Sequence, residues 1–197
     1  MLLKKTPVLI EEHYLKNQSN YSDFNIYFQD ESRFGLFTRN GKALTAKGIK
    51  PLCDYHHKFE NTYLFGAFSS INGNSFMLEL PFCNTDMFQL FLEQFHEQNP
   101  QEFKIIFLDN GAFHKAKRLM IPASIGLIFL PPYSPELNPA EKVWWTIKRE
   151  IKMRVYQTLE DLQIHLQEII QKLITIKKIK SLTKYRLFLS AYRSVFN

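Results

Sequence analysis

The sequence predicts an α/β domain built on a mixed sheet that is covered by helices. Short apolar, aromatic-rich segments follow one another in the first half of the chain, and helical segments then alternate with further strands. This order is typical of an antiparallel meander that is followed by parallel strands. The 197 residues, of which 45% are hydrophobic, can bury one substantial core that is rich in phenylalanine and tyrosine.

The first elements are predicted from periodicity and from breaks in it. Residues 6–16 have the pattern of a short amphipathic helix, and the polar segment NQSNYSD ends it. The apolar run at residues 24–29 predicts the first strand. Residues 35–46 contain the turn-like Arg39, Asn40 and Gly41, so we interpret this segment as a hairpin.

The middle of the chain continues the sheet and adds the first covering helix. Residues 61–70 and 75–80 predict two strands around a turn at 71–74, and Met87, Leu90, Phe91 and Phe95 give residues 85–97 a helical period. The remaining expected elements are a strand at 103–108, a short helix at 112–120, a strand at 125–130 and a helix at 139–154.

The helix at residues 139–154 divides into two faces. Its expected buried stripe consists of Val143, Trp144, Ile147 and Ile151. A second stripe consists of Glu141, Trp145, Lys148 and Lys152. A DNA backbone that begins at Glu141 would follow the two lysines, although ordinary surface lysines and a partly buried tryptophan explain the same pattern.

The C-terminal segment predicts a helix that packs on another helix. Thr158 and Asp161 have the spacing of a capping box. The seam that follows consists of Leu159, Leu162, Leu166, Ile169, Leu173 and Ile176. Because it spans fewer than three heptads, we favour docking onto the domain over a self-associating coil. We expect an N-terminal helix and linker at 1–23, a catalytic domain at 24–156 and a basic helical extension at 157–197.

Three acidic residues from distant segments suggest a divalent-metal site. Asp30 and Asp109 each follow a short apolar run, which is how a strand places a carboxylate at the edge or tip of a sheet. Glu141 follows a loop that is stiffened by Pro131, Pro132, Pro135 and Pro139. Carboxylate oxygens suit Mg²⁺, with Mn²⁺ as a substitute.

The motifs around these acids resemble those of the DDE transposases, specifically the bacterial insertion-sequence branch of the mariner-like superfamily. The resemblance covers about residues 24–155 and rests on QDESRFGL, on the strand that leads into LDNGAFH and on LPPYSPELNPAEKVW. It implies a ribonuclease H-like fold with helices on both faces of the sheet. It also implies DNA cleavage at transposon ends and strand transfer into target DNA by a homo-oligomer.

The resemblance further implies two Mg²⁺ ions, or Mn²⁺, held by Asp30, Asp109 and Glu141. In that arrangement Asp30 bridges the two ions, and each of the other acids completes one site. The sequence does not itself distinguish these roles. Water would cut the transposon end, and the liberated 3′-hydroxyl would attack target DNA.

Several neighbours of the acids are candidates for supporting roles. Asn110 and His114 match the family pattern and would orient Asp109 or a phosphate, while a turn residue and a surface histidine are the alternatives. Glu31 is expected to face away from Asp30 and to form hydrogen bonds. The loop residues Tyr133, Ser134 and Asn138 are expected to shape the approach to Glu141, with DNA contact as an alternative.

Arg33 and Lys42 are candidate secondary DNA contacts or solvated residues. A zinc site at Cys53, His56 and His57 is disfavoured because no second cluster accompanies it.

The charge is concentrated towards the C-terminus. The chain carries a net +6, and residues 141–197 hold 12 Lys and Arg against 5 Asp and Glu. Such asymmetry is typical of a protein that binds a polyanion from one side, and a solvated lysine-rich surface is the alternative. Double-stranded DNA is therefore an expected partner.

The location and completeness of the protein can also be predicted. We find neither a membrane-length apolar run nor a signal peptide, so a cytoplasmic location is expected. Asp30 lies so near the N-terminus that a helix-turn-helix module for reading transposon ends is expected upstream or in another reading frame. A catalytically silent DNA-binding or assembly remnant and a host nuclease of the same fold are the alternatives to a transposase.

Overall fold

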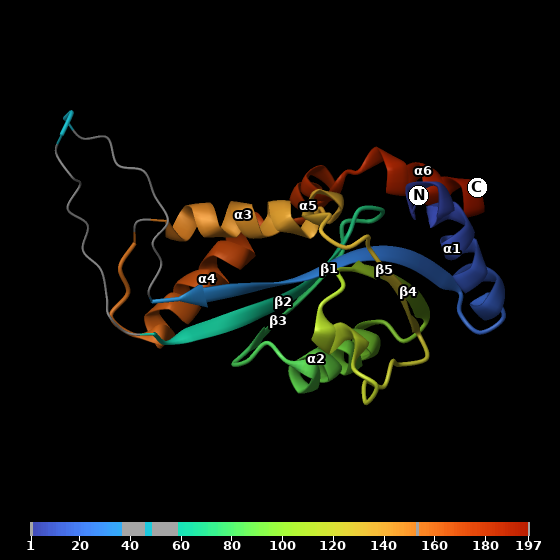
Figure 1. Cartoon of the computed structure of the whole chain (residues 1–197), viewed down its shortest axis with the longest axis horizontal. Helices are drawn as coiled ribbons and strands as arrows, with labels where there is room; N and C mark the ends of the chain where they lie inside the picture. Colours follow the sequence, from blue (N-terminus) through green and yellow to red (C-terminus); the bar gives the residue numbers. More distant parts are fainter. Residues whose placement is uncertain (1, 37–45, 49–58, 153, 197) are drawn as a thin grey trace.

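The computed structural model describes residues 2–36, 46–48, 59–152 and 154–196. Its centre is a five-stranded sheet in the order β3-β2-β1-β4-β5 (Figure 1). The strands are β1 (Asp23–Gly35), β2 (Asn61–Ser69), β3 (Ser75–Leu80), β4 (Glu102–Leu108) and β5 (Ile125–Phe129). The first three pair antiparallel, whereas β1, β4 and β5 pair parallel. The predicted mixed sheet is therefore confirmed.

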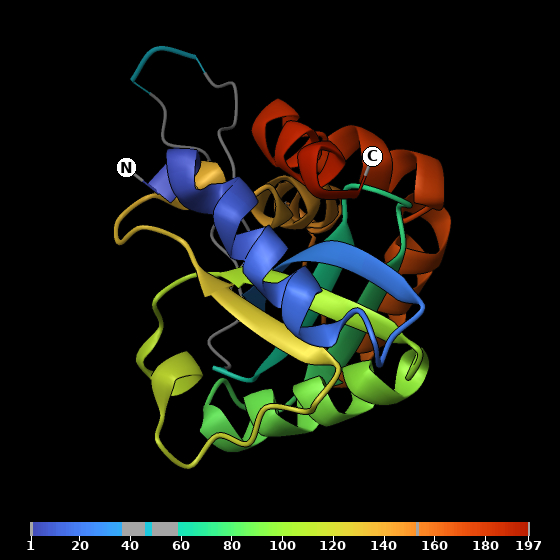
Figure 2. The ribbon, with the colours of Figure 1, turned by 90° about the vertical axis from the view of Figure 1, so that its right-hand side faces the viewer.

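Helices cover both faces of this sheet. One face carries α1 (Leu2–Asn17), α3 (Ala140–Ile151), α4 (Leu159–Leu173), α5 (Ile176–Thr183) and α6 (Arg186–Phe196), and the other carries α2 (Thr85–Gln98) (Figures 1 and 2). The larger core lies under α3 and includes Phe28, Phe107 and Trp144. The smaller core lies against α2 and includes Phe91.

Local sequence explains where several helices begin. Asn84 caps α2 by accepting from the Met87 amide at 3.0 Å. Thr158 and Asp161 form a reciprocal capping box at α4, which confirms that prediction. The α4 residues Leu162 and Leu166 are fully buried in the larger core. The C-terminal seam therefore docks onto the sheet domain, except that Ile176 lies in α5 and is 60% exposed.

Two predicted elements differ clearly in extent, and a third cannot be compared. The first strand continues beyond residue 29 to Gly35, because residues 30–35 pair with β2. The helix expected at 112–120 is only a 3-10 turn, η1 (Ala112–Lys115), where His114 is drawn into the interior. Most of the hairpin expected at 35–46 lies outside the described residues.

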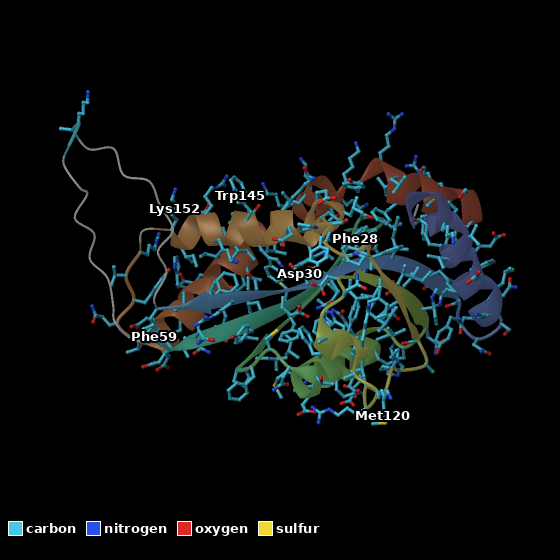
Figure 3. All side chains as sticks on the ribbon, viewed as in Figure 1. Phe28, Asp30, Phe59, Met120, Trp145 and Lys152 are labelled. Atoms are coloured by element: carbon cyan, nitrogen blue, oxygen red, sulfur yellow. The ribbon has the colours of Figure 1, made fainter. Side chains whose placement is uncertain are left out.

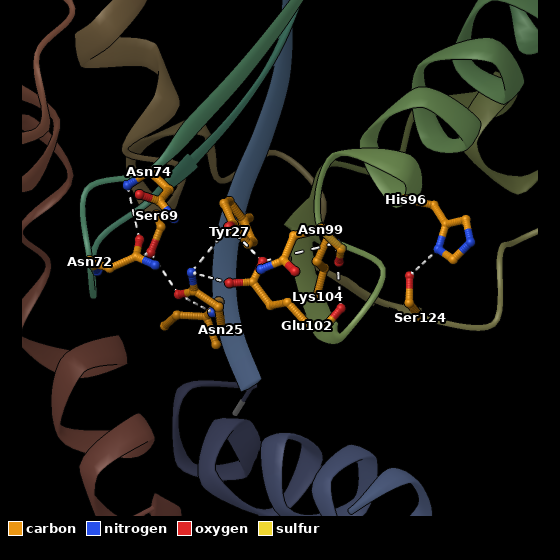
Figure 4. Close-up of polar contacts among 11 residues, drawn as sticks. Asn25, Tyr27, Ser69, Asn72, Asn74, His96, Asn99, Glu102, Lys104 and Ser124 are labelled. Atoms are coloured by element: carbon orange, nitrogen blue, oxygen red, sulfur yellow. Dashed lines mark hydrogen bonds and ion pairs between the residues drawn. The ribbon is translucent and has the colours of Figure 1, made fainter. Parts of the chain in front are cut away.

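A buried polar network fixes the amino ends of β1 and β4 against each other (Figure 4). The Asn25 side chain and the Tyr27 hydroxyl donate to the Glu102 carboxylate at 3.1 and 2.8 Å, and the Ser69 hydroxyl donates to Asn25 at 2.7 Å. Burial, followed by the charge of Glu102, raises the pKa of Tyr27, so its hydroxyl remains a donor. Because polar groups buried this deeply must be paired, the network favours a single β1–β4 register.

Candidate active site

The register of the parallel strands places Asp30 beside Asp109. The last paired residues of β1 and β4 are Phe28 and Phe107, so two further steps along each strand bring the two aspartates opposite each other. Side chains alternate along a strand, and Phe28 and Phe107 both lie in the core beneath α3. Asp30 therefore lies on the α3 face of the sheet, and Asp109 follows directly after the last residue of β4 at the adjacent end of the sheet.

Glu141 reaches the same face from the first turn of α3. The loop before α3 is tied to β1 by Asn138, whose side-chain Nδ2 donates to the Gln29 carbonyl at 2.8 Å. The Asn138 Oδ1 accepts from the Ala140 amide at 3.1 Å, so the same side chain also pairs with a main-chain donor at the start of α3. Asp30 lies between β1 and the overlying α3 (Figure 3).

The electrostatics of Asp30 link the three acids. Burial, and then the negative charges of Glu31, Glu141 and Asp109, raise the pKa of Asp30 well above its ordinary value. Glu141 and Asp109 thus lie within electrostatic reach of Asp30. Within the described ranges, no three His, Cys, Asp or Glu side chains lie close enough together to hold a metal ion. The negative charge around Asp30 is nevertheless of the kind that a cation would offset.

His114 connects Asp109 to Glu31. Its Nε2 lies 3.0 Å from the Glu31 carboxylate in a hydrogen bond, and its Nδ1 lies 2.9 Å from Asp109 Oδ1. The Nδ1 contact is an ion pair without hydrogen-bond alignment. Burial alone would lower the pKa of His114, but the two carboxylates outweigh it and raise this pKa to about 9. The same histidine is the main cause of the lowered pKa of Asp109.

The expected hydrogen-bonding role of Glu31 agrees with these contacts. Glu31 also accepts from the Gln29 side chain at 2.6 Å. His114 is buried and packs against Phe88 of α2 at a ring-centroid distance of 4.4 Å, so it is not a surface residue. Through these contacts, Glu31 holds the His114 ring and His114 in turn restrains the Asp109 side chain.

Asn110 and Ser134 hold the loops that flank Asp109. The Asn110 side chain donates to the Leu130 carbonyl and accepts from the Lys115 ammonium. The Ser134 hydroxyl donates to the Pro132 carbonyl at 3.3 Å. Tyr133, between Pro132 and Ser134, points its side chain into solvent. The structure therefore shows loop-shaping contacts for Asn110 and Ser134.

The outer face of α3 agrees with the predicted division of the helix. The four residues expected in the core, Val143, Trp144, Ile147 and Ile151, are all buried. Trp145 is 63% exposed, with the Arg149 guanidinium 5.1 Å from its ring centroid. Trp145 and the exposed Lys152 mark the side of α3 that faces away from the sheet (Figure 3).

The Lys148 side chain is half-buried, whereas the Lys152 side chain is exposed. The Lys148 Nζ lies 5.7 Å from the Phe34 ring centroid, so the side chain leans over the far end of β1. Arg33 is exposed on β1, but strand alternation places it on the face of Glu31 rather than that of Asp30. The other candidates, Lys42, Cys53, His56 and His57, lie outside the described residues.

One expectation about Asp30 is corrected, and some residues were missed. Asp30 lies inside β1 and pairs with Gly66 of β2, rather than at a strand tip, because β2 is longer than the β1–β4 ladder. Gly66 was missed, although a single glycine within the apolar run YLFGAF is a recognised sign of close approach. Arg149, which stacks on Trp145, was also missed. Its position eight residues after Glu141 was the available signal.

Comparisons with known proteins show the fold and the family. The crystal structure of the Mos1 strand transfer complex is similar, with a TM-score of 0.65 at 14% identity, over 98% of this chain and 59% of that chain. The Mos1 mariner transposase catalytic domain gives a TM-score of 0.58 at 14% identity, over 98% and 92% of the two chains. This chain thus shares the ribonuclease H-like fold, and it spans about 60% of the longer Mos1 chains.

Sequence comparisons add one relative and the family. An uncharacterised protein of Sinorhizobium fredii, y4pE/y4sA, is 33% identical over 105 residues, which are 52% of this chain and 78% of that protein. No helix among the described residues is long and apolar enough to cross a membrane. Residues 25–163 match the family described as DDE superfamily endonuclease, and because this match covers most of the chain, the chain belongs to that family.

Proposed function

We propose that this chain is the catalytic domain of a transposase, which cleaves DNA phosphodiester bonds at transposon ends and transfers the cut strand to target DNA. The observation that carries the proposal is the negative field around Asp30, whose pKa is raised by burial and then by the charges of Glu31, Glu141 and Asp109. Membership in the endonuclease family favours an enzyme over a silent remnant.

The three acids would hold a divalent cation. Several carboxylates around the half-buried Asp30 leave negative charge that Mg²⁺ or Mn²⁺ would offset, and oxygen-only donors suit both ions. Asp30, Asp109 and Glu141 would be the residues that hold the ions. When bound, the ions would lower the pKa of water and stabilise the attacking and leaving oxygens. Mos1 paired-end complexes with Mg and with Mn support this assignment.

The remaining residues position these acids. His114 and Glu31 hold Asp109 from behind, and Asn138 holds the start of α3 against β1. These contacts limit the freedom of Asp109 and Glu141 before substrate arrives. Such preorganisation is the protein's main contribution to an in-line displacement at phosphorus.

DNA would run from the acids along the outer face of α3. Lys148, Lys152 and Arg149 supply positive charge there, and Trp145 supplies an exposed ring. Arg33 and Lys42 remain candidate secondary contacts. Neutralisation of phosphates by such residues gives affinity without sequence preference.

Specific recognition and assembly would need further components. The Mos1 transposase forms a paired-end complex with the left transposon end, and its chains in such complexes are longer than the matched region. By analogy we assign double-stranded DNA, both transposon ends and target, as the substrate, and a homo-oligomer as the active form. An upstream helix-turn-helix module or reading frame would read the ends, and the bacterial insertion-sequence branch is the proposed origin.

The test is a cleavage and strand-transfer assay with Mg²⁺ and the DNA ends that flank the gene for this chain. We expect metal-dependent cutting followed by joining, and loss of both in Asp109→Asn. The matched control is Asp86→Asn. Asp86 is an exposed aspartate of α2 that pairs with Arg118, and its replacement should leave activity unchanged. Cutting without joining would identify a nuclease of the same fold, and DNA binding without cutting would identify a silent remnant.

A further inference from the structure

Tyr133 has an unusual backbone conformation and an unusual exposure. Its φ of 57° makes it the one non-glycine residue in the described part of the chain that occupies the left-handed region. Its side chain is 101% exposed, and no described residue provides a ring or hydrogen-bond partner for it. A bulky residue in this region is strained, and persistent strain of this kind often marks a functional position.

The loop that carries Tyr133 is fixed on both sides. On one side the Leu130 amide donates to the Leu108 carbonyl at 2.8 Å. On the other side the Leu137 amide donates to the Ser134 carbonyl at 3.1 Å, and Asn138 is bonded to β1. The exposed ring therefore projects from a braced loop.

A pocket of about 470 Å³ lies between this loop and Asp109. Its lining includes Leu130, Pro131 and Pro135, the polar residues Asp109 and Asn110, and Tyr133. A largely apolar pocket with a few polar groups is the usual form of a small-ligand site.

The lining indicates which part of a DNA substrate would enter. No lysine or arginine lines the pocket, and Asp109 repels anions, so the walls do not suit a phosphate. A flat, neutral heterocycle suits them better, because it can stack on an aromatic ring and pack against proline. The Asn110 side chain is already bonded to Leu130 and Lys115, so sequence-specific contacts from it are not expected.

We infer that this pocket receives a nucleobase next to the reacting phosphate, and that the base stacks on Tyr133. The inference rests on the proposed function, because a phosphate held by metal ions at the three acids would bring the neighbouring base within reach of the pocket. Tyr133 is a positioning residue in this arrangement. Stacking would hold the strand in place without selecting a particular base, since every base presents an aromatic face.

The test uses a forked DNA duplex with one unpaired 2-aminopurine at the fork, because stacking on tyrosine quenches its fluorescence. Binding is measured with Ca²⁺ in place of Mg²⁺, and the readout is fluorescence, so it does not depend on cleavage. Wild-type protein should quench the probe, and Tyr133→Phe should do so equally because it keeps the ring. Tyr133→Asn should lose the quenching and bind about 5- to 150-fold more weakly.

Asparagine is the informative replacement, because it tolerates a left-handed backbone while removing the ring. Equal thermal unfolding of Tyr133→Asn and wild type would exclude misfolding as the cause of a binding loss. Unchanged quenching and affinity in folded Tyr133→Asn would overturn the inference, even if wild type cleaves DNA. Tyr133-dependent quenching by a protein that never cleaves would support the pocket and refute the proposed function instead.

Discussion

The Asn138 side chain donates to the Gln29 main-chain carbonyl at 2.8 Å, and this bond joins the loop before Glu141 to the residue before Asp30. Two acids separated by more than a hundred positions are thereby held through one buried amide. The same side chain accepts from the Ala140 amide at the start of α3. Within the motif SPELNPAEK, Asn138 therefore serves to attach the loop and the start of α3 to β1.

Replacing Asn138 with alanine should therefore weaken both the fold and the site. The buried Gln29 carbonyl would lose its partner, which costs about 1–3 kcal/mol of unfolding free energy. Urea denaturation measures this loss, and DNA cleavage should fall as α3 loses its anchor. Asn61→Ala is the matched control, because the Asn61 side chain makes a similar bond to the Phe59 carbonyl at an exposed position. A control loss of less than about 0.5 kcal/mol is expected.

Gly66→Ala should disturb the packing between β2 and α3 next to Asp30. Gly66 pairs with Asp30, and an added Cβ would lie 2.5 Å from Phe68 Cζ and 2.7 Å from Trp144 Cη2. Trp144 belongs to α3, so relief of the clash would move the helix that carries Glu141. We expect a loss of about 1–3 kcal/mol in unfolding free energy, measured by urea denaturation. Wild-type stability and wild-type cleavage together would show that the contact is easily relieved.

The two faces of α3 should respond to mutation in opposite ways. Changing Lys148 and Lys152 together to alanine should flatten the slope of log affinity for DNA against log salt by about one to two units. Changing Lys5 and Lys16 on α1, both exposed, is the matched control and should leave the slope intact. An unchanged slope in the α3 double variant would mean that DNA follows another surface.

The buried face of α3 should instead affect stability. Ile147 is fully buried beneath the helix, so Ile147→Ala should lower the unfolding free energy by about 2–5 kcal/mol. The double lysine variant should change it by no more than about 0.5 kcal/mol. Equal effects of the two changes in chemical denaturation would contradict the assignment of the faces.

His13 should make stability depend on pH. Its ring packs against Gly126 of β5 and near Phe103, and burial, then the charge of Lys16, lower its pKa below 6.5, with Glu12 opposing. On acidification the unfolded chain therefore takes up this proton first, so stability falls as pH drops below about 6.5. In His13→Gln this part of the decline should disappear in denaturant titrations. An identical pH profile in the variant would refute the role of His13.

The sequence predicted most of the sheet, because its strands are apolar and bounded by polar breaks. The three acids were predicted as a set from their motifs, but their surroundings were not predicted. The polar segment QDES gave no sign that β1 continues through Asp30, since the continuation depends on pairing with distant β2. The end of η1 likewise depends on tertiary contacts, because His114 is held between Asp109 and Glu31. Contacts of this range cannot be read from local periodicity.

The most direct measurement of the central claim is Mn²⁺ binding, followed by electron paramagnetic resonance in the presence of duplex DNA. If Asp30, Asp109 and Glu141 hold the metal, then Asp30→Asn, Asp109→Asn and Glu141→Gln should each weaken binding by at least about tenfold. Asp86→Asn and Glu150→Gln, which change exposed acids on α2 and α3, should bind Mn²⁺ as wild type does. Undiminished Mn²⁺ binding by any one of the three site variants would contradict the account.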